Sequence, residues 1–353
     1  MTKKAVLNER QKAFRSLLKK NKLDGFVLTN SIDQLYLLGF PFYPEEAVVV
    51  FHPKGISAFI RTLYLQPFGK VAPQVRSFGE DKDRVAAAVE AIKELKLKNV
   101  GFDAAKESYY TGKVFSQNGF IETEGFVGKL REQKDNEEYK VLRASNRIAY
   151  EAYEYIRPRV KTGMTENELG AELERFMRLK GALSTSFYSI VCFGENTANP
   201  HHQSSDRKLK AEEPVLIDFG CLYHNYCSDI TRSWWHGKKE PAEYTKIWKI
   251  VEKARKAGIK TAKAGVKTKE VDGASRGVIE AAGYGEFFTH RTGHGVGLEI
   301  HELPNNSADS PAVLAEGNVV TVEPGIYLPE KFGVRLEDTI FITKTGNKIL
   351  TKK

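Results

Sequence analysis

Carboxylates stand inside the most strand-like segments in the second half of this chain. An apolar run that contains Asp218 is followed by a second strand-like segment that contains Asp229. A two-residue turn at Tyr223–His224 would join the segments and pair Leu222 with Asn225. Counting outward from that pair places Asp218 opposite Asp229. Side chains directly opposite on antiparallel strands share a face, with Cβ atoms about 4.5 to 5.5 Å apart. The pattern therefore predicts two aspartates side by side on one sheet surface.

A second pair of carboxylates follows near the C-terminus. A three-residue loop at Pro329–Lys331 would join the segments that contain Glu323 and Glu337 and place these residues opposite each other. A single acidic residue is ordinarily a solvated surface charge, so neither pair is decisive alone. Unit charges about 4 Å apart repel by about 4 kcal/mol at an effective dielectric near 20. Two such pairs in apolar strands predict that bound cations compensate the charge.

Three histidines, His290, His294 and His301, cluster between these carboxylate segments. The glycines at 293, 295 and 297 oppose a helix, so this is not a helical metal-binding pair of the His-Glu-x-x-His kind. An extended glycine-rich strand presents imidazoles where backbone or substrate comes close. A lone histidine is more often structural, but three of them beside two carboxylate pairs indicate a functional site. Oxygen ligands with one nitrogen donor suit Mn²⁺, and Co²⁺ or Zn²⁺ could also occupy the site.

Length and composition limit the alternatives. A chain of 353 residues is long enough for two domains, and no apolar run reaches the length of a membrane span. The net charge of +9 comes from lysines scattered among glutamates, so we expect neither a nucleic-acid partner nor a membrane. An odd cysteine count (Cys192, Cys221 and Cys227) and the absence of a signal-peptide pattern favour a cytoplasmic location.

Alternating helical and strand-like patterns at the N-terminus predict a mixed α/β domain. The expected helices are residues 7–21 and 81–96, and the expected strands are Gly25–Thr29, Ala47–Phe51, Ile56–Ile60 and Asn99–Phe102. The charged stretch Lys129–Glu138 marks the expected boundary between domains at residues 1–130 and 131–353.

The second domain is expected to begin with a long helix that runs to about Tyr155. Thr165 and Glu168 then match a capping box, which predicts a helix over residues 166–179. Further helices are expected at 241–262 and 268–282, with late strands at Val319–Val322 and Val334–Thr343.

Together these segments resemble the pita-bread metallopeptidases, in the branch that contains aminopeptidase P and prolidase. The resemblance covers about 120 residues and rests on the order Asp, Asp, His, Glu, Glu with the family's intervals. It implies an α/β protein with a ribonuclease-H-like, creatinase-type N-terminal domain followed by a pita-bread catalytic domain. By position, Asp218 would chelate one metal ion and His294 and Glu323 the other. Asp229 and Glu337 would bridge both ions.

The resemblance also implies an activity, which is attack by a metal-bridging hydroxide on the peptide bond before a proline, with Glu323 as proton shuttle. Further residues fall on the family's outer positions: His201, His290, His301, Tyr327 and Arg335. His201 and His301 would polarise the scissile group, and Arg335 would hold the carboxylates in place. The implied enzyme contains two divalent ions per chain, acts on proline-containing peptides and forms a homodimer.

Within this branch, the residue after His301-Glu-Leu-Pro304 bears on substrate length. Many prolidases have an arginine there, which recognises the free carboxylate of a dipeptide. Asn305 cannot form that bidentate ionic contact. The sequence therefore favours an Xaa-Pro aminopeptidase that accepts longer peptides, with the dipeptide-specific prolidase as the alternative. Methionine aminopeptidase fits less well, because the N-terminal domain is long and the interval from Glu323 to Glu337 is short.

Two other classes of function compete with this interpretation. Gly273–Gly277 matches the Gly-x-Ser-x-Gly pattern of a serine hydrolase, with Ser275 as nucleophile. That motif requires a preceding strand, whereas residues 269–282 have a helical pattern. A non-catalytic peptide-binding module would retain the fold without cutting peptides, and metal content measured together with turnover would distinguish it.

Overall fold

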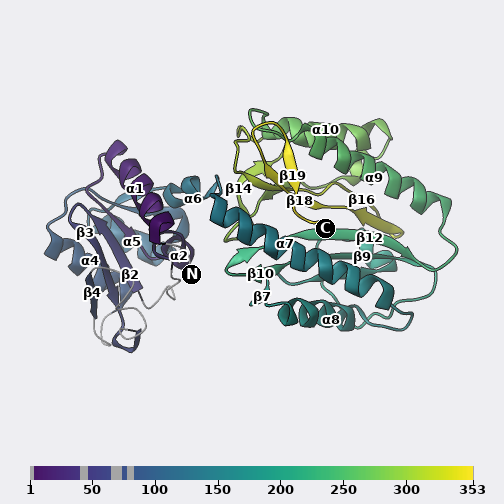
Figure 1. Ribbon diagram of the computed structural model, residues 1–353, viewed down its shortest axis with the longest axis horizontal. Helices are drawn as coiled ribbons and strands as arrows, with labels where there is room; N and C mark the ends of the chain where they lie inside the picture. The colour runs from purple at the N-terminus through teal and green to yellow at the C-terminus, as the bar shows by residue number, and fades with distance from the viewer. Residues whose placement is uncertain (1–3, 40–46, 65–73, 78–82, 353) are drawn as a thin grey trace. The chain divides into compact units, whose positions relative to one another are not determined.

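The computed structural model describes residues 4–39, 47–64, 74–77 and 83–352. The chain divides into two compact units, Met1–Arg131 and Glu132–Lys353, which Figure 1 colours from purple to blue and from teal to yellow. Among the helices within these ranges, none has both the length and the apolar composition needed to cross a membrane.

The first unit is built on a six-stranded sheet with the order β4-β3-β2-β1-β5-β6. Its strands are β1 (Gly25–Leu28), β2 (Ala47–His52), β3 (Gly55–Ile60), β4 (Gln74–Ser77), β5 (Val100–Asp103) and β6 (Ile121–Thr123). Its helices are α1 (Lys4–Lys20), α2 (Ser31–Leu38), α4 (Arg84–Leu95), α5 (Tyr109–Gln117) and α6 (Phe126–Arg131). The mixed α/β pattern predicted for this region is confirmed, and residues 81 and 82 of the second expected helix lie outside the described residues.

The second unit repeats one plan, in which two helices are followed by strands. The first half contains α7 (Asn136–Ile156), α8 (Glu166–Leu179), β7 (Ser184–Thr185), β8 (Ile190–Phe193), β9 (Glu213–Phe219), β10 (Cys221–Tyr223), β11 (Tyr226–Cys227) and β12 (Ile230–His236). The second half contains α9 (Ala242–Thr261), α10 (Thr268–Ala281), β13 (Gly293–Gly295), β14 (Glu302–Asn306), β15 (Val319–Val322), β16 (Gly325–Leu328), β17 (Phe332–Arg335), β18 (Asp338–Ile342) and β19 (Asn347–Ile349).

Each half buries its own apolar core between helices and strands. One core joins α7 and α8 to β8, β9 and β12. The other half has two clusters, which join α9 and α10 to β15, β16, β17 and β18. In Figure 1, α9 and α10 lie above the strands and α8 lies below them. The strands are thus enclosed on two sides, and the functional segments are carried on the sheets between the helices.

Two local predictions in this unit are confirmed. The capping box at the start of α8 has both of its bonds, because Thr165 Oγ1 accepts from the Glu168 amide and Glu168 Oε2 accepts from the Thr165 amide. The segment around Ser275 is part of α10, as its pattern predicted. The Ser275 hydroxyl is buried and donates to the carbonyl of Ala254, so the strand-to-helix turn of a serine hydrolase is not formed there.

The first predicted hairpin has the right strands but the wrong turn. Tyr223 pairs with Tyr226, so the turn residues are His224 and Asn225, one position later than predicted. Both have positive φ, 47° and 67°, which is the geometry of a tight hairpin turn that asparagine tolerates well. Moving the turn by one residue shifts every cross-strand partner by two.

The pairing of the two aspartates is therefore wrong, although their shared face is right. Asp218 lies opposite Thr231 rather than Asp229. Because side chains alternate with a period of two, a shift of two residues leaves Asp229 on the predicted face as a diagonal neighbour.

The second predicted hairpin is confirmed in its register. Leu328 pairs with Phe332 across the loop at residues 329–331, and Gly325 pairs with Arg335. Pairing resumes in the same register where Val322 meets Asp338. This register places Glu323 across from Glu337.

Candidate metal centre

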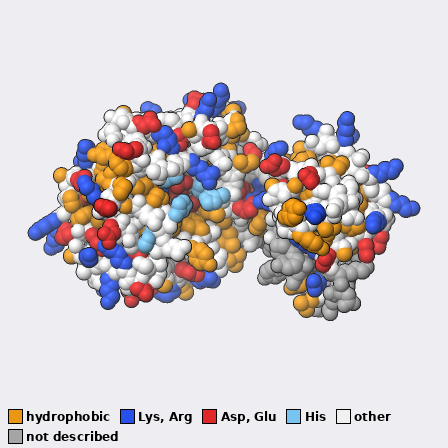
Figure 2. Space-filling view, turned by 180° about the vertical axis from the view of Figure 1, so that it is seen from behind, with side chains coloured by type: hydrophobic (Ala, Val, Ile, Leu, Met, Phe, Trp, Pro, Cys, Tyr) orange, Lys and Arg blue, Asp and Glu red, His pale blue; other side chains and the backbone are white. Residues whose placement is uncertain are grey.

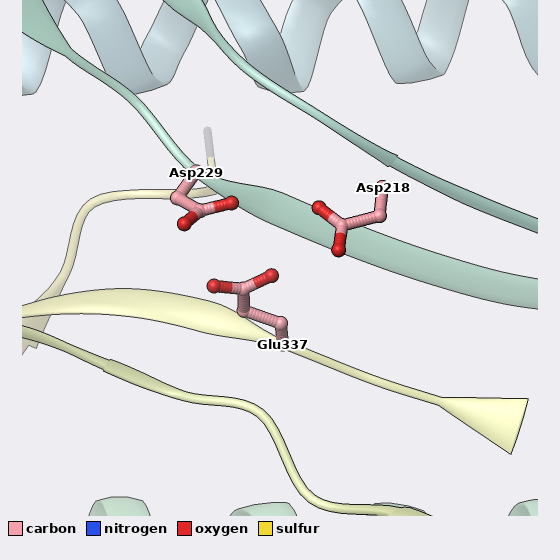
Figure 3. Close-up of side chains that lie close together, drawn as sticks. All are labelled: Asp218, Asp229 and Glu337. Carbon is pink, nitrogen blue, oxygen red and sulfur yellow. The ribbon is translucent and has the colours of Figure 1, made fainter. Parts of the chain in front are cut away.

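The five predicted metal ligands come from separate segments of the larger unit. Asp218 lies on β9, Asp229 just before β12, His294 on β13, Glu323 just after β15, and Glu337 between β17 and β18. The carboxylates of Asp218, Asp229 and Glu337 point toward one another in Figure 3, and one oxygen from each lies within 4.8 Å of the others. His294 Nε2 lies 3.5 Å from Asp229 Oδ2 and 3.4 Å from Glu323 Oε1. All five side chains therefore meet at one place.

The oxygens of this cluster are only partly satisfied by the protein. Arg335 donates to Asp218 Oδ2 at 2.6 Å, and the Thr231 hydroxyl donates to Glu337 Oε2 at 2.6 Å. The other oxygens, Asp218 Oδ1 and Glu337 Oε1, are buried without a hydrogen-bond partner among the described residues. A buried acceptor without a partner costs about 1 to 3 kcal/mol, and more when it is charged. These oxygens fit the role of ligands to a cation.

Burial and mutual repulsion both act against ionisation of the carboxylates. Burial raises the pKa of Asp229 well above its usual value, and the neighbouring Glu337 and Asp218 raise it further. Burial likewise raises the pKa of Glu337, with Glu323 and Asp218 adding to the effect. For Glu323, burial raises the pKa to about 7 despite the nearby positive charge of Arg335. Divalent cations would relieve this crowding and restore the ionised forms.

The imidazole of His294 is held in the form that binds metals. Its Nδ1 lies 3.1 Å from the carbonyl of Gly295, and because a carbonyl only accepts, Nδ1 carries the proton. Burial, followed by the charge of His301, lowers the pKa of His294 to about 3, so the ring is neutral at physiological pH. Its unprotonated Nε2 faces Asp229 and Glu323.

Arg335 connects this cluster to a hydrogen-bonded chain behind it. The guanidinium donates to Asp218 and, at 2.8 Å, to the Tyr327 hydroxyl. His290 Nδ1 donates to the carbonyl of Arg291, so its Nε2 accepts from Tyr327 at 2.8 Å. Burial lowers the pKa of His290 to about 4, which keeps this ring neutral. The chain from His290 through Tyr327 to Arg335 fixes the orientation of Asp218.

A cavity of about 1000 Å³ opens over the cluster. Its lining includes the five candidate ligands together with His201, His290, His301 and Arg335. Tyr327 does not line it and acts through its bonds to Arg335 and His290. The ring of His301 lies 4.3 Å from that of His294, and His201 is exposed on the cavity wall. Figure 2 shows histidine side chains in pale blue gathered on one face of the larger unit.

Several residues that support the site were not found from the sequence. Thr231 stands opposite Asp218 and orients both Glu337 and Arg335. Glu166, at the start of α8, has a fully buried side chain that holds the segment carrying His201. A correct turn at His224–Asn225 would have revealed Thr231, because it follows from counting along the hairpin. Glu166 has no such signal, because an acidic residue in a first helical turn is common on surfaces.

Two sequence models of known protein families match this chain. The sequence model described as Metallopeptidase family M24 matches residues 140–344, and the model described as Creatinase/Prolidase N-terminal domain matches residues 10–133. The Xaa-Pro dipeptidase of Pyrococcus horikoshii is 34% identical over 356 residues, which covers 98% of this chain and 98% of that protein.

Solved structures are similarly close. The Xaa-Pro dipeptidase from Bacillus anthracis superposes with a TM-score of 0.92 at 36% identity, covering 98% of each chain. The X-Pro aminopeptidase from Thermotoga maritima superposes with a TM-score of 0.86 at 31% identity, covering 96% of this chain and 98% of that one.

Proposed function

Because this chain belongs to metallopeptidase family M24, we propose that it is a metal-dependent exopeptidase that cleaves the bond before a proline. The observation that carries the proposal is the convergence of four carboxylates and His294 in one cavity, where two buried carboxylate oxygens have no partner among the described residues. The predicted fold class is confirmed, with a creatinase-type domain preceding the catalytic domain. We further propose that these domains are residues 1–130 and 131–353.

The ligand set suits divalent ions. We propose that two ions bind per chain, with Asp218 on one, His294 and Glu323 on the other, and Asp229 and Glu337 shared between them. Oxygen ligands with a single imidazole favour Mn²⁺ or Co²⁺, and Zn²⁺ is compatible. When bound, such ions lower the pKa of water and polarise a carbonyl oxygen.

The residues around the ligands then have separate tasks. Glu323 would take a proton from the attacking water at its carboxylate and return it to the proline nitrogen, which leaves as a secondary amine. Arg335 would keep Asp218 oriented through its 2.6 Å contact. His201 and His301, on the cavity wall, would hydrogen-bond the scissile group, while His290 and Tyr327 would hold Arg335 from behind.

Proline recognition requires contact with the ring, because a peptide bond to proline has no N–H to donate. The cavity wall offers Ile300 beside the imidazoles of His201 and His301. We propose that these three side chains contact the pyrrolidine ring.

The deciding experiment measures metal content and turnover on the same sample. Metal-stripped protein, checked by elemental analysis, should be inactive on Ala-Pro and on Ala-Pro-Ala, and Mn²⁺, Co²⁺ or Zn²⁺ should restore cleavage. Replacing proline by alanine in each peptide is the control, and these peptides should resist cleavage. A serine-directed reagent should leave activity unchanged. A non-catalytic peptide-binding module would bind the peptides without turnover in any metal, and that result would reject the proposal.

We propose two further features, a cytoplasmic location and a homodimer. The described cysteines, Cys192, Cys221 and Cys227, are free and buried, as is usual in a reducing compartment such as the cytoplasm. Family resemblance supports a homodimer, which light scattering on the purified protein would test.

A further inference from the structure

The cavity wall contains a cation that the proposed chemistry does not use. Among the described residues that line the cavity, the arginines are Arg335 and Arg291. Arg335 is buried and committed to Asp218 and Tyr327. Arg291 is exposed, and its guanidinium donates to Asn305 Oδ1 at 3.3 Å. It forms no ion pair with a residue in the described ranges, so its charge is available to a ligand in the cavity.

The positive charge of Arg291 acts on residues of the candidate metal centre and on His301 beside it. Burial lowers the pKa of His301, and Arg291 lowers it further. The same charge also acts to lower the pKa values of His294 and Glu323. Arg291 is also tied to the site by the backbone, since its carbonyl accepts from His290 Nδ1 at 2.8 Å. The guanidinium therefore stands within electrostatic range of a substrate that lies against His301.

The partner of Arg291 holds it without neutralising it. Asn305 is a neutral acceptor, so the contact orients the guanidinium while leaving its full positive charge. A carboxylate at this position would instead form an ion pair and cancel the charge. A guanidinium with free donors matches the planar geometry of a carboxylate and binds it through two parallel hydrogen bonds.

We propose that Arg291, positioned by Asn305, binds the free C-terminal carboxylate of a short substrate and gives the enzyme a preference for Xaa-Pro dipeptides. This inference rests on the proposed function. It reverses the length preference that the sequence favoured, because Asn305 lacks a charge itself but contacts a residue that has one. In a longer peptide, the carboxylate is replaced by a neutral peptide group, which gains much less from the guanidinium.

The test compares ligands that differ only in this carboxylate. Metal-loaded wild-type protein and Arg291→Gln are assayed on Ala-Pro and on its amide, Ala-Pro-NH₂. We expect Arg291→Gln to lower kcat/KM for Ala-Pro by roughly 10- to 100-fold, mainly through a higher KM. The kcat/KM for Ala-Pro-NH₂ should change by less than about twofold. Arg291→Lys should recover part of the loss, because it keeps the charge without the planar fork.

A second variant neutralises the charge of Arg291 without replacing that residue. Asn305→Asp should pair with Arg291 and raise KM for Ala-Pro while sparing the amide. The matched control is Arg143→Gln, which removes an exposed arginine on α7 that does not line this cavity, and both substrates should be unaffected. An equal loss on both substrates in Arg291→Gln would show a structural role and overturn the proposal.

Binding measurements separate this proposal from the proposed function. Calorimetric titration with L-proline and L-prolinamide needs no turnover, and wild-type protein should prefer L-proline, whereas Arg291→Gln should not. If wild-type protein cleaves no Xaa-Pro peptide but shows this preference, the proposed function fails and the role of Arg291 stands. Absence of the preference overturns the role of Arg291. A loss of kcat/KM in Arg291→Gln that is confined to Glu-Pro-NH₂ would also overturn this role, because the guanidinium would then bind an acidic side chain of the substrate.

Discussion

Replacing Glu166 with glutamine should destabilise the larger unit from outside the metal centre. The Glu166 side chain is fully buried, and its oxygens accept five hydrogen bonds. One oxygen accepts from the Phe193 amide and from Asn196 Nδ2, each at 2.9 Å. The other accepts from His202 Nε2 at 2.8 Å and from the amide and hydroxyl of Ser205 at 3.0 and 2.7 Å. These bonds hold the segment that carries His201 into the cavity wall.

The size of the effect follows from which bonds a neutral amide can keep. Glutamine retains one acceptor oxygen but turns an NH₂ group toward the amide of Ser205, so that bond is lost. The hydroxyl of Ser205 and the ring of His202 can reverse their donor roles. A hydrogen bond to a charged group contributes about 1.5 to 3 kcal/mol, against about 0.5 to 1.5 kcal/mol for a neutral pair. Losing the bond from the Ser205 amide costs about 1.5 to 3 kcal/mol, and weakening those from Phe193 and Asn196 costs about 1 to 1.5 kcal/mol each, so the total is about 3.5 to 6 kcal/mol.

The chain supplies its own probe for this unit. All of its tryptophans, Trp234, Trp235 and Trp248, lie in the larger unit, so urea unfolding followed by tryptophan fluorescence reports on that unit. The free energy of unfolding should fall by about 3.5 to 6 kcal/mol in Glu166→Gln with an unchanged urea dependence. Glu168→Gln, on the exposed side of the same helix, should lose less than about 1 kcal/mol. If the free energies of unfolding of the two variants differ by less than about 1 kcal/mol, the reasoning is refuted.

The pH dependence gives an independent check with a definite sign. Burial alone raises the pKa of Glu166, but hydrogen bonds from His202, Asn196 and Ser205 outweigh it and hold the pKa below the usual 4.5. A depressed folded-state pKa contributes stability that is present above the unfolded pKa and is lost as pH falls through the folded one. The loss in free energy of unfolding caused by Glu166→Gln should therefore be constant between about pH 6 and 8 and become smaller below about pH 4.5.

Further predictions concern the metal centre and the first unit. Asp229→Asn should lose bound metal as well as rate, because a neutral amide cannot replace a shared carboxylate; a variant with unchanged metal by elemental analysis and near-normal turnover would contradict the shared role. His301→Ala should keep its metal but lower kcat by roughly 10²-fold or more, since we place this ring at the substrate; metal loss like that of Asp229→Asn would make it a ligand. Burial raises the pKa of Glu107 to about 7, so its contribution to stability is present below pH 4.5 and lost as pH rises toward 7. Glu107→Gln should accordingly raise the melting temperature at pH 8 and leave it nearly unchanged at pH 4.5, and an equal shift at both pH values would exclude titration of Glu107 as the cause.

Local patterns in the sequence predicted most of the elements and the shared face of the ligands. The loop at residues 329–331 was correct, and the register that follows from it placed Glu323 across from Glu337. The first turn was misplaced because the preference of Asn225 for positive φ was not used. Alternation along the strands limited the error, since a shift of two positions returns each side chain to the same face.

The contacts that complete the site could not be predicted in this way. Arg335 meets Asp218 across 117 residues of chain, and Glu166 holds a segment that begins 27 residues later. Arg291 lies just before β13 and Asn305 lies on β14, and these two strands pair across a register irregularity. None of these contacts follows from a repeating sequence pattern, because each depends on how segments distant along the chain pack against one another. The resemblance to a family supplied Arg335 but neither Glu166 nor Arg291.

Three of the five candidate ligands lie where regular strand pairing is interrupted, and this placement has a physical reason. Asp229, Glu323 and Glu337 each stand just outside a strand, where the backbone can turn a carboxylate toward a common point. Those segments are tied to one another by their backbones: the Glu337 amide donates to the carbonyl of Thr231, and the Glu323 amide to that of Thr292. Close approach of the chains requires glycine nearby, since a Cβ at Gly293 would lie 2.1 Å from the Thr321 carbonyl oxygen. The fold thus holds like charges together through backbone bonds that do not depend on the charges themselves. Cations that neutralise the cluster should therefore add to the stability of a scaffold that already positions their ligands.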